Sequence, residues 1–272
     1  MNIQFKRFFS VDSPKAIKAA EFNYLNAINY MSPARSGGVG NLCSHASAGC
    51  IALCLGLESG QAAMVEKATG TNVVRESRKR KAQYFMRDRA AYMSEMLFHI
   101  AANVRTAKKK GMKLCVRPNG STDIAYEGVR VFVSPEFAAK LSKVSGLEVT
   151  PGLHNIFSAF PSVQFVDYTK NPKRFDRAIA ANYSLTFSRS ETNEADAIAL
   201  LNRGVNVAVV FAVLPATWNG FTVIDGDLSD LRHLDPKGAR GYVIGLTPKG
   251  HKARKSDNGF VIQNAAEFAL AA

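Results

Sequence analysis

Three of the four cysteines in the chain, Cys43, Cys50 and Cys54, lie within a short stretch of sequence. If residues 49–55 are helical, the four-residue spacing puts the sulfur atoms of Cys50 and Cys54 on one helix face. Cys43 would approach from the preceding loop, which the glycines of residues 37–40 make pliable. Three thiolates that converge on one point suit a soft metal ion or an iron–sulfur cluster. The sequence therefore predicts a metal site at these cysteines, with one coordination position left for another ligand.

Two other interpretations of the cysteines stay open at this point. Free cysteine is among the residue types most often buried, and Ile51, Leu53 and Leu55 are typical neighbours of a core thiol. A disulfide between two of the three is the other interpretation. The spacing C-x6-C-x3-C matches neither a zinc ribbon nor a ferredoxin. His45 lies beside the cysteines and is a candidate fourth ligand, whereas Cys115 stands apart in an apolar run.

The composition indicates a globular protein with a polyanionic partner. Of its 272 residues 47% are hydrophobic and 21% charged, which is enough to bury a core. The formal net charge is +13, and such an excess most often accompanies nucleic-acid binding. No apolar run approaches the length of a membrane span, and residues 1–9 lack the features of a signal peptide. A cytoplasmic location is therefore expected, and a structural disulfide is disfavoured there.

The elements that must position the cysteines form one domain of two segments. Residues 1–111 are expected to be mainly helical and to carry the cysteine loop, and residues 112–272 to consist of repeated βα units. Helices are predicted at residues 14–30, 73–110, 135–141, 154–160, 172–181 and 194–202, and strands at residues 3–11, 113–117, 163–166, 183–187, 205–213, 221–224 and 242–246. Such units favour a parallel sheet, and their right-handed crossovers lead to a TIM-like (β/α) barrel or partial barrel.

Polar side chains follow the carboxyl ends of successive predicted strands. They are Asn119 and Asp123, then Asp167, Tyr168 and Lys170, then Ser188, Arg189 and Glu191, and finally Asp225 and Asp227. In a parallel sheet these ends share one edge, where the sites of α/β proteins lie. Any one of these residues is more often a turn former or a helix cap. Their recurrence at several strand ends predicts a shared polar mouth.

The long helix predicted at residues 73–110 has a dense group of cations in its first half. They are Arg75, Arg78, Lys79, Arg80, Lys81, Arg87 and Arg89. Like charges at helical spacing repel one another, so the cluster needs an explanation. The two interpretations are a solvated helix face and a surface that contacts a phosphate backbone.

Several short motifs together resemble the gene product eighty-eight family, a group of proteins encoded mainly by phages and prophages. The resemblance begins with the cysteine stretch Cys43 to Cys54. It continues through Arg117-Pro-Asn-Gly-Ser-Thr-Asp123, Val166-Asp-Tyr-Thr-Lys-Asn-Pro-Lys-Arg-Phe175, Phe187-Ser188, Asp225-Gly-Asp-Leu-Ser-Asp-Leu-Arg232, Gly245-Leu-Thr-Pro-Lys-Gly250 and Gly259-Phe-Val261. It covers most of the chain from residue 37 onward.

The layout is also similar to that of the wider radical-SAM-like group, in which three N-terminal cysteines precede a (β/α) partial barrel. That resemblance implies a [4Fe-4S] cluster on Cys43, Cys50 and Cys54, with its open iron bound to S-adenosylmethionine. The spacing here departs from the C-x3-C-x2-C of that group, and Leu53 stands where an aromatic residue precedes the last cysteine. The residues expected to hold the ligand are Asn119, Asp123, Asp167, Lys170, Ser188 and Arg189. No catalytic residue is identified.

Two function classes follow from these observations. The leading hypothesis is a phage-type iron–sulfur protein of the host cytoplasm, a radical-SAM-like enzyme that acts on a nucleotide or nucleic acid. The alternative is a non-enzymatic protein that binds nucleic acid or a host protein and whose cysteines hold a structural zinc ion. A metal-free barrel with its thiols in the core is a third hypothesis.

Overall fold

A mostly parallel sheet of nine strands runs through the protein, whose computed structural model describes residues 3–263. Its strands are β1 (Tyr24–Ile28), β2 (Lys113–Arg117), β5 (Gln164–Thr169), β6 (Tyr183–Ser188), β7 (Val207–Phe211), β8 (Thr217–Trp218), β9 (Phe221–Asp225), β10 (Val243–Leu246) and β11 (Val261–Ile262). The order is β1-β2-β5-β6-β7-β10-β9-β8, with β11 also paired to β7. Among the strands in residues 3–263, β8 and β9 are the only neighbours in this sheet that pair antiparallel. A separate antiparallel pair consists of β3 (Val131–Val133) and β4 (Gly152–His154).

The predicted α/β class and its parallel sheet are confirmed, but no closed barrel is found in residues 3–263. The sheet is open, with β1 at one end of the strand order and β8 at the other. The reason lies in the last strands. β10 lies between β7 and β9, so the β8–β9 hairpin extends the sheet outward and does not return the chain to β1.

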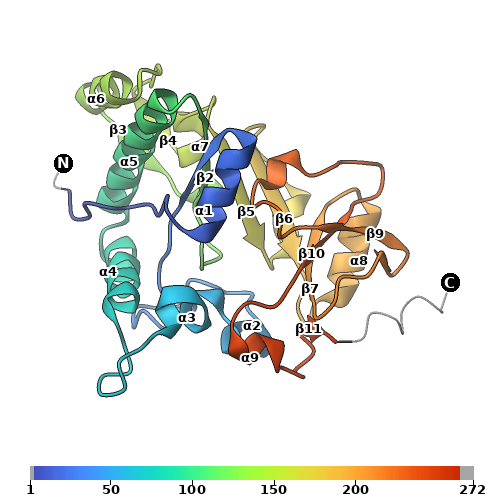
Figure 1. Cartoon of the computed structure of the whole chain (residues 1–272). Helices are drawn as coiled ribbons and strands as arrows, with labels where there is room; N and C mark the ends of the chain where they lie inside the picture. Colours follow the sequence, from blue (N-terminus) through green and yellow to red (C-terminus); the bar gives the residue numbers. More distant parts are fainter. Residues whose placement is uncertain (1–2, 264–272) are drawn as a thin grey trace.

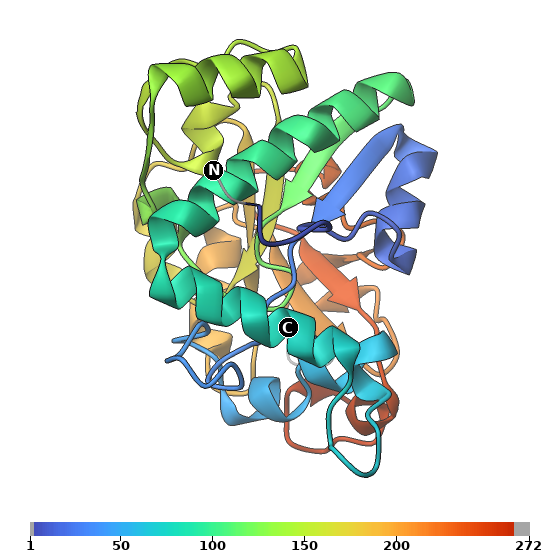
Figure 2. The same cartoon turned by 90° about the vertical axis from the view of Figure 1, so that its left-hand side faces the viewer.

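The longer helices cover one face of the sheet, the N-terminal helical segment of residues 14–22 packs on the opposite face, and short helices lie at one end (Figures 1 and 2). The helices are α1 (Pro14–Lys18), α2 (Ala48–Ala52), α3 (Leu55–Glu58), α4 (Val73–Arg87), α5 (Arg89–Lys109), α6 (Pro135–Ser145), α7 (Ile156–Ala159), α8 (Glu194–Asn202) and α9 (His251–Arg254). Short 3-10 turns add η1 (Ala19–Phe22), η2 (Gly60–Ala63), η3 (Tyr126–Gly128), η4 (Pro172–Asp176) and η5 (Arg232–Leu234). Figure 1 shows α2, α3 and α9 gathered at one end of the sheet.

The two faces of the sheet differ in polarity because side chains alternate along each strand. On one face, Leu25, Val116 and Phe165 are buried in an apolar core with α5, α6 and α7. Farther along the sheet, a second core packs that face against α8. The opposite face carries buried polar residues such as Asn26 and Arg117, and η5 lies against it at β5 and β6. The helix-covered face therefore stabilises the fold, whereas the other face can carry polar chemistry.

The first strand of the sheet was predicted as part of a helix, and that prediction is wrong. Residues 14–22 are helical, but Asn23 adopts a left-handed φ of 61° and β1 begins at the next residue. The apolar residues of 24–28 fit either periodicity. Parallel pairing with β2 and burial against α5 decide for the strand. Because β1 belongs to the same sheet as the later βα units, residues 3–111 and 112–263 share one sheet.

Other boundaries differ from the predicted ones for local reasons. The long helix divides at Asp88, whose extended backbone and side-chain bond to the N–H of Ala91 cap α5. Residues 3–11 contribute only an isolated bridge, between Ser10 and Ile28. The helix predicted at 172–181 is limited to the 3-10 turn η4.

The prediction that no segment crosses a membrane can be compared with the helices themselves. Within residues 3–263, no helix combines the length and the apolar character that a membrane span requires.

Candidate functional site

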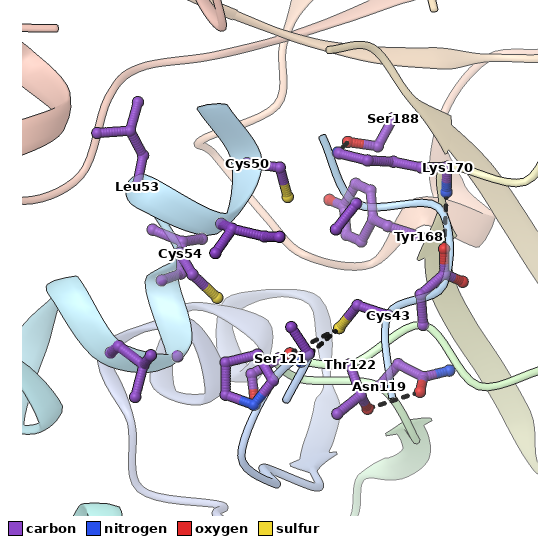
Figure 3. Close-up of a pocket in the computed structure, with 18 of the residues that line it drawn as sticks. Cys43, Cys50, Leu53, Cys54, Asn119, Ser121, Thr122, Tyr168, Lys170 and Ser188 are labelled. Carbon is purple, nitrogen blue, oxygen red and sulfur yellow. Dashed lines mark hydrogen bonds between the residues drawn. The ribbon is translucent and has the colours of Figure 1, made fainter. Parts of the chain in front are cut away.

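A cavity of about 490 Å³ lies where the parallel strands end. One wall is the cysteine stretch with α2 and α3, and the other consists of residues that follow β2, β5, β6 and β10. Cys43, Cys50 and Cys54 all line it. Figure 3 shows their sulfur atoms pointing into the same space from three sides. The structure thus brings the three cysteines together at the predicted polar mouth.

The helix that carries Cys50 is shorter than predicted. Ser47 caps α2 by accepting a hydrogen bond from the N–H of Cys50, and α2 ends at Ala52. Cys54 is the residue before α3, so Cys50 and Cys54 do not share a continuous helix. They still reach one cavity because the chain turns between the two short helices.

Glu191 fastens this helix to the sheet. Its carboxylate accepts hydrogen bonds from the N–H of Gly49 at 2.7 Å and from Ser47 Oγ at 2.8 Å. Burial opposes ionisation, but these hydrogen bonds and the charge of Lys170 lower the pKa of Glu191. A Cβ at position 49 would come within 2.8 Å of the carboxylate, so a larger residue there would require the Glu191 side chain to move. The residue that follows β6 therefore sets the position of Cys50.

Part of the basic cluster on α4 turns inward, contrary to both interpretations of it. Arg75 donates hydrogen bonds to the carbonyls of Leu57 and Ala62, and Arg78 donates to the carbonyl of Gly56. Lys81 is buried and donates to a carbonyl of the N-terminal segment. The two arginines satisfy carbonyls at the end of the cysteine segment, which a short helix leaves unpaired, and Lys81 holds the N-terminal segment instead. The arginines are structural supports for the wall of the cavity.

The environment of Cys43 and Cys54 favours the protonated thiol at neutral pH. Burial is the main cause that raises the pKa of Cys43 to about 12 and that of Cys54 to about 11, and the neighbouring cysteines raise both further. Cys43 Sγ accepts a hydrogen bond from the N–H of Ala34 at 3.2 Å. A metal would have to displace these protons. Within residues 3–263, no group of three or more His, Cys, Asp or Glu side chains is arranged to hold a metal ion.

His45 does not join the cysteines. Its side chain is exposed, it shares a hydrogen bond with Ser44, and it is not among the residues that line the cavity. The prediction of a fourth protein ligand at this position has no geometric support.

Lys170 is the central cation of the opposite wall. Its Nζ donates to Ser188 Oγ at 2.6 Å and lies 5.3 Å from the centre of the Phe260 ring. In the part of the chain that the structure describes, no carboxylate oxygen lies within ion-pair distance of this ammonium group. A cation that lines a cavity without an ion-pair partner is able to bind an anionic group of a ligand.

Asn119 and Asp123 line the cavity but have other hydrogen-bond partners. Asn119 holds its own loop through Thr122 and Ile124. The two carboxylate oxygens of Asp123 accept from the N–H of Lys170 and from Arg174. Both residues therefore position the loop after β2 against β5, and they present only part of their polar surface to the cavity.

Two of the predicted ligand residues lie away from the cavity. Asp167 is fully buried and accepts a hydrogen bond from Asn119 at 2.6 Å. Arg189 forms an ion pair with Glu194 and donates to the carbonyl of Gly259. Asp167 does not line the cavity because side chains alternate along β5. Alternation places Asp167 on the helix-covered face, while its neighbour Tyr168 faces the cavity.

The sequence analysis did not predict that Arg117, Thr247 and Lys249 line the cavity. It placed Tyr168 and Asp227 at the polar mouth but did not include them among the residues expected to hold the ligand, and both line the cavity. Arg117 pairs with Asp230 at 3.0 Å and lies over the Tyr168 ring. Asp227 accepts from both Thr247 and Lys249, and these bonds lower its pKa although burial opposes the shift. Two signals in the sequence could have identified Arg117, Thr247 and Lys249. Arg117 lies on the same face of β2 as Cys115 because side chains alternate, and Thr247 and Lys249 follow the end of β10.

A comparison with known proteins agrees with the motif resemblance. The family model described as Gene product 88 matches residues 7–264. No curated protein and no solved structure matches the chain.

Proposed function

The chain belongs to the gene product 88 family, and we propose that it binds an iron–sulfur cluster through Cys43, Cys50 and Cys54 beside a ligand site in the same cavity. The observation that carries the proposal is that three thiols, one on a loop, one in α2 and one just before α3, line one cavity from different sides (Figure 3). Buried thiols that only fill a core have no reason to point into a common open space.

The donor set suits a cluster better than a single zinc ion. Four-coordinate zinc requires its ligands within about 2.3 Å of one point. The described residues contain no such group of His, Cys, Asp or Glu. A [4Fe-4S] cluster is a larger body whose irons reach separate thiolates, so its cysteines stand farther apart than the ligands of one ion. The cavity, at about 490 Å³, has room for a cluster and for a further small molecule.

The radical-SAM-like part of the proposal rests on the order of the strands. The cysteine stretch follows β1, and β1, β2, β5, β6 and β7 lie side by side in chain order. A bound cluster of this kind supplies one electron at a time, which in that group starts a reaction on S-adenosylmethionine. The chain's own residues bind and orient the ligand. Lys170 attracts an anionic group, Ser188 fixes the ammonium, and Leu53 and Val261 exclude water on the apolar side.

Anaerobic reconstitution with iron and sulfide tests the proposal. We expect about four irons per chain and the broad visible absorbance of a [4Fe-4S] cluster. Replacing Cys43, Cys50 or Cys54 by Ser should reduce the iron content severely. Cys115→Ala is the matched control, because Cys115 lies on β2 and does not line the cavity.

Two results would contradict the proposal in different ways. The cluster site would be refuted if the protein, made under iron-replete and oxygen-free conditions, contained no iron. An equal loss of iron in Cys115→Ala would also refute it. If the cluster-loaded, reduced protein does not cleave S-adenosylmethionine, the cluster site would stand, but the radical-SAM-like part of the proposal would be refuted.

A further inference from the structure

Exposed cations flank the cavity on two sides. They are Lys79, Arg80, Arg87 and Arg89 at the α4–α5 corner, and Lys252, Arg254 and Lys255 at α9. We refer to these seven residues as the basic rim. Within residues 3–263, only Lys252 of the rim forms an ion pair with a carboxylate, to Glu58 at 2.8 Å. The rest are uncompensated positive charge on a chain of net charge +13.

The α4 side of the rim continues into the cavity wall. Arg80, Gln83 and Arg87 lie on one helix face because they are separated by three and four residues. Gln83 on that face donates to the carbonyl of Gly37, in the loop whose Arg35 lines the cavity. The exposed arginines of α4 thus stand beside the loop that leads into the site.

The α9 side also adjoins the wall of the cavity. Ala253 lines the cavity and packs against Leu53 and Val261, so the cations on either side of it are held at the opening. Lys249 precedes this helix and reaches the cavity as well. In Figure 1, α9 lies beside α2 and α3 at the same end of the sheet. Cationic residues therefore lie on both sides of the cavity, and Lys170 lies inside it.

We propose that the protein binds single-stranded nucleic acid, with the phosphate backbone of the nucleic acid on the basic rim and one nucleotide in the cavity. This deepens the proposed function and rests on it for the role of the cavity. Phosphates explain the uncompensated cations of the rim, and Lys170 with the half-buried Phe260 ring offers one nucleotide a charge and an aromatic surface. A base within a duplex could not reach the cavity without leaving the stack.

Fluorescence anisotropy with labelled single-stranded DNA and RNA of the same sequence, at several salt concentrations, tests this proposal. We expect Arg80→Glu/Arg87→Glu to weaken binding at least tenfold. The slope of log affinity against log salt should fall by about 1.4, because the variant no longer neutralises two of the phosphates. Arg80→Gln/Arg87→Gln should bind more weakly than the parent but more tightly than the glutamate variant. Arg105→Glu/Lys109→Glu is the control, because it changes the net charge equally at the far end of α5 and should bind within twofold of the parent.

The position of the nucleotide is tested by photo-cross-linking with a 4-thiouridine oligonucleotide. Cross-links in the peptides that contain Tyr168 or Phe260 support entry into the cavity, and cross-links confined to α4 and α9 overturn it. Equally weakened binding in the rim and control variants, or equal affinity for a duplex of the same length, overturns the proposal of a single-strand site. Iron content is measured on the same samples. If the protein binds the oligonucleotide but takes up no iron, the proposed cluster would be refuted, and the proposal that the basic rim binds nucleic acid would stand.

Discussion

Adjacent residues on β5 have opposite environments, and this decides which of them takes part in the site. Tyr168 faces the cavity with Arg117 over its ring, whereas Asp167 points into the helix-covered face and is fully buried. Burial is the main cause that raises the pKa of Asp167 to about 7. Its carboxyl group accepts a hydrogen bond from Asn119, and so it supports the cavity from behind.

Asp167→Asn should be more stable than the parent protein at pH 8 but not at pH 5. The folded pKa of about 7 lies above the ordinary value of 3.8, so the carboxyl holds its proton more tightly in the folded state. Its contribution to stability is complete below about pH 4 and is lost as the pH rises through 7. Asparagine is neutral throughout and can still accept from Asn119. Thermal unfolding at the two pH values measures the difference.

The control for this prediction is Asp176→Asn. Asp176 is exposed and pairs with Arg203 at 3.1 Å on the surface, where such pairs contribute little. Its substitution should change the unfolding temperature by the same small amount at both pH values. If Asp167→Asn behaves in the same way, the carboxyl is ionised in the folded protein across this range.

At the scale of the elements, the cysteine segment is held by its neighbours and not by its own helices. The helices α2 and α3 are only five and four residues long, too short to be stable alone. Glu191 holds the start of α2, Arg75 and Arg78 bind the carbonyls around α3, and α9 packs against Leu53. The position of the thiols therefore depends on three distant parts of the chain.

Glu191→Ala should loosen α2 without unfolding the protein. It leaves the N–H of Gly49 and the hydroxyl of Ser47 without their carboxylate, which costs about 1–3 kcal/mol where they stay buried. Amide hydrogen exchange of residues 47–53 should become faster, and iron loading should fall with it. Glu148→Ala, at an exposed position, is the control and should change neither. Unchanged exchange at 47–53 in Glu191→Ala would show that α9 and α4 suffice to hold the segment.

At the scale of the whole molecule, the apolar cores are independent of the cysteines. The larger core joins α5, α6 and α7 to β1, β2 and β5, and the second joins α8 to β6, β7 and β10. The three cavity cysteines belong to neither. The fold is thus complete behind the cavity, and the site lies on its edge.

If the protein binds the proposed cluster, removal of that cluster by a chelator under oxidant should therefore leave the protein folded. Far-ultraviolet circular dichroism should be unchanged, while hydrogen exchange in residues 43–58 should increase at least tenfold relative to the loaded protein. The physical reason is that local opening of the cysteine wall does not expose either apolar core. Cooperative loss of tertiary structure on chelation would contradict this prediction, because it would make the cluster part of the folding nucleus.

The sequence by itself determined features that depend on local pattern. The cysteine spacing is part of the sequence itself. We predicted from the sequence the α/β class, the strands β2 and β6, and α8 with its bounds at Glu194 and Asn202. The polar residues after successive strands also predicted a common mouth, and Asn119, Asp123, Lys170 and Ser188 do line one cavity. These features follow from alternation, capping and the shared edge of parallel strands, which neighbouring residues specify.

Tertiary structure alone decided the rest. Residues 24–28 became a strand because β2 offered a partner, and Arg75 and Arg78 turned inward because unpaired carbonyls of the cysteine segment lay within reach. The sheet stayed open because β10 entered between β7 and β9. In each case the deciding contact joins residues distant in the chain, and its free energy depends on register and burial, which no local pattern contains.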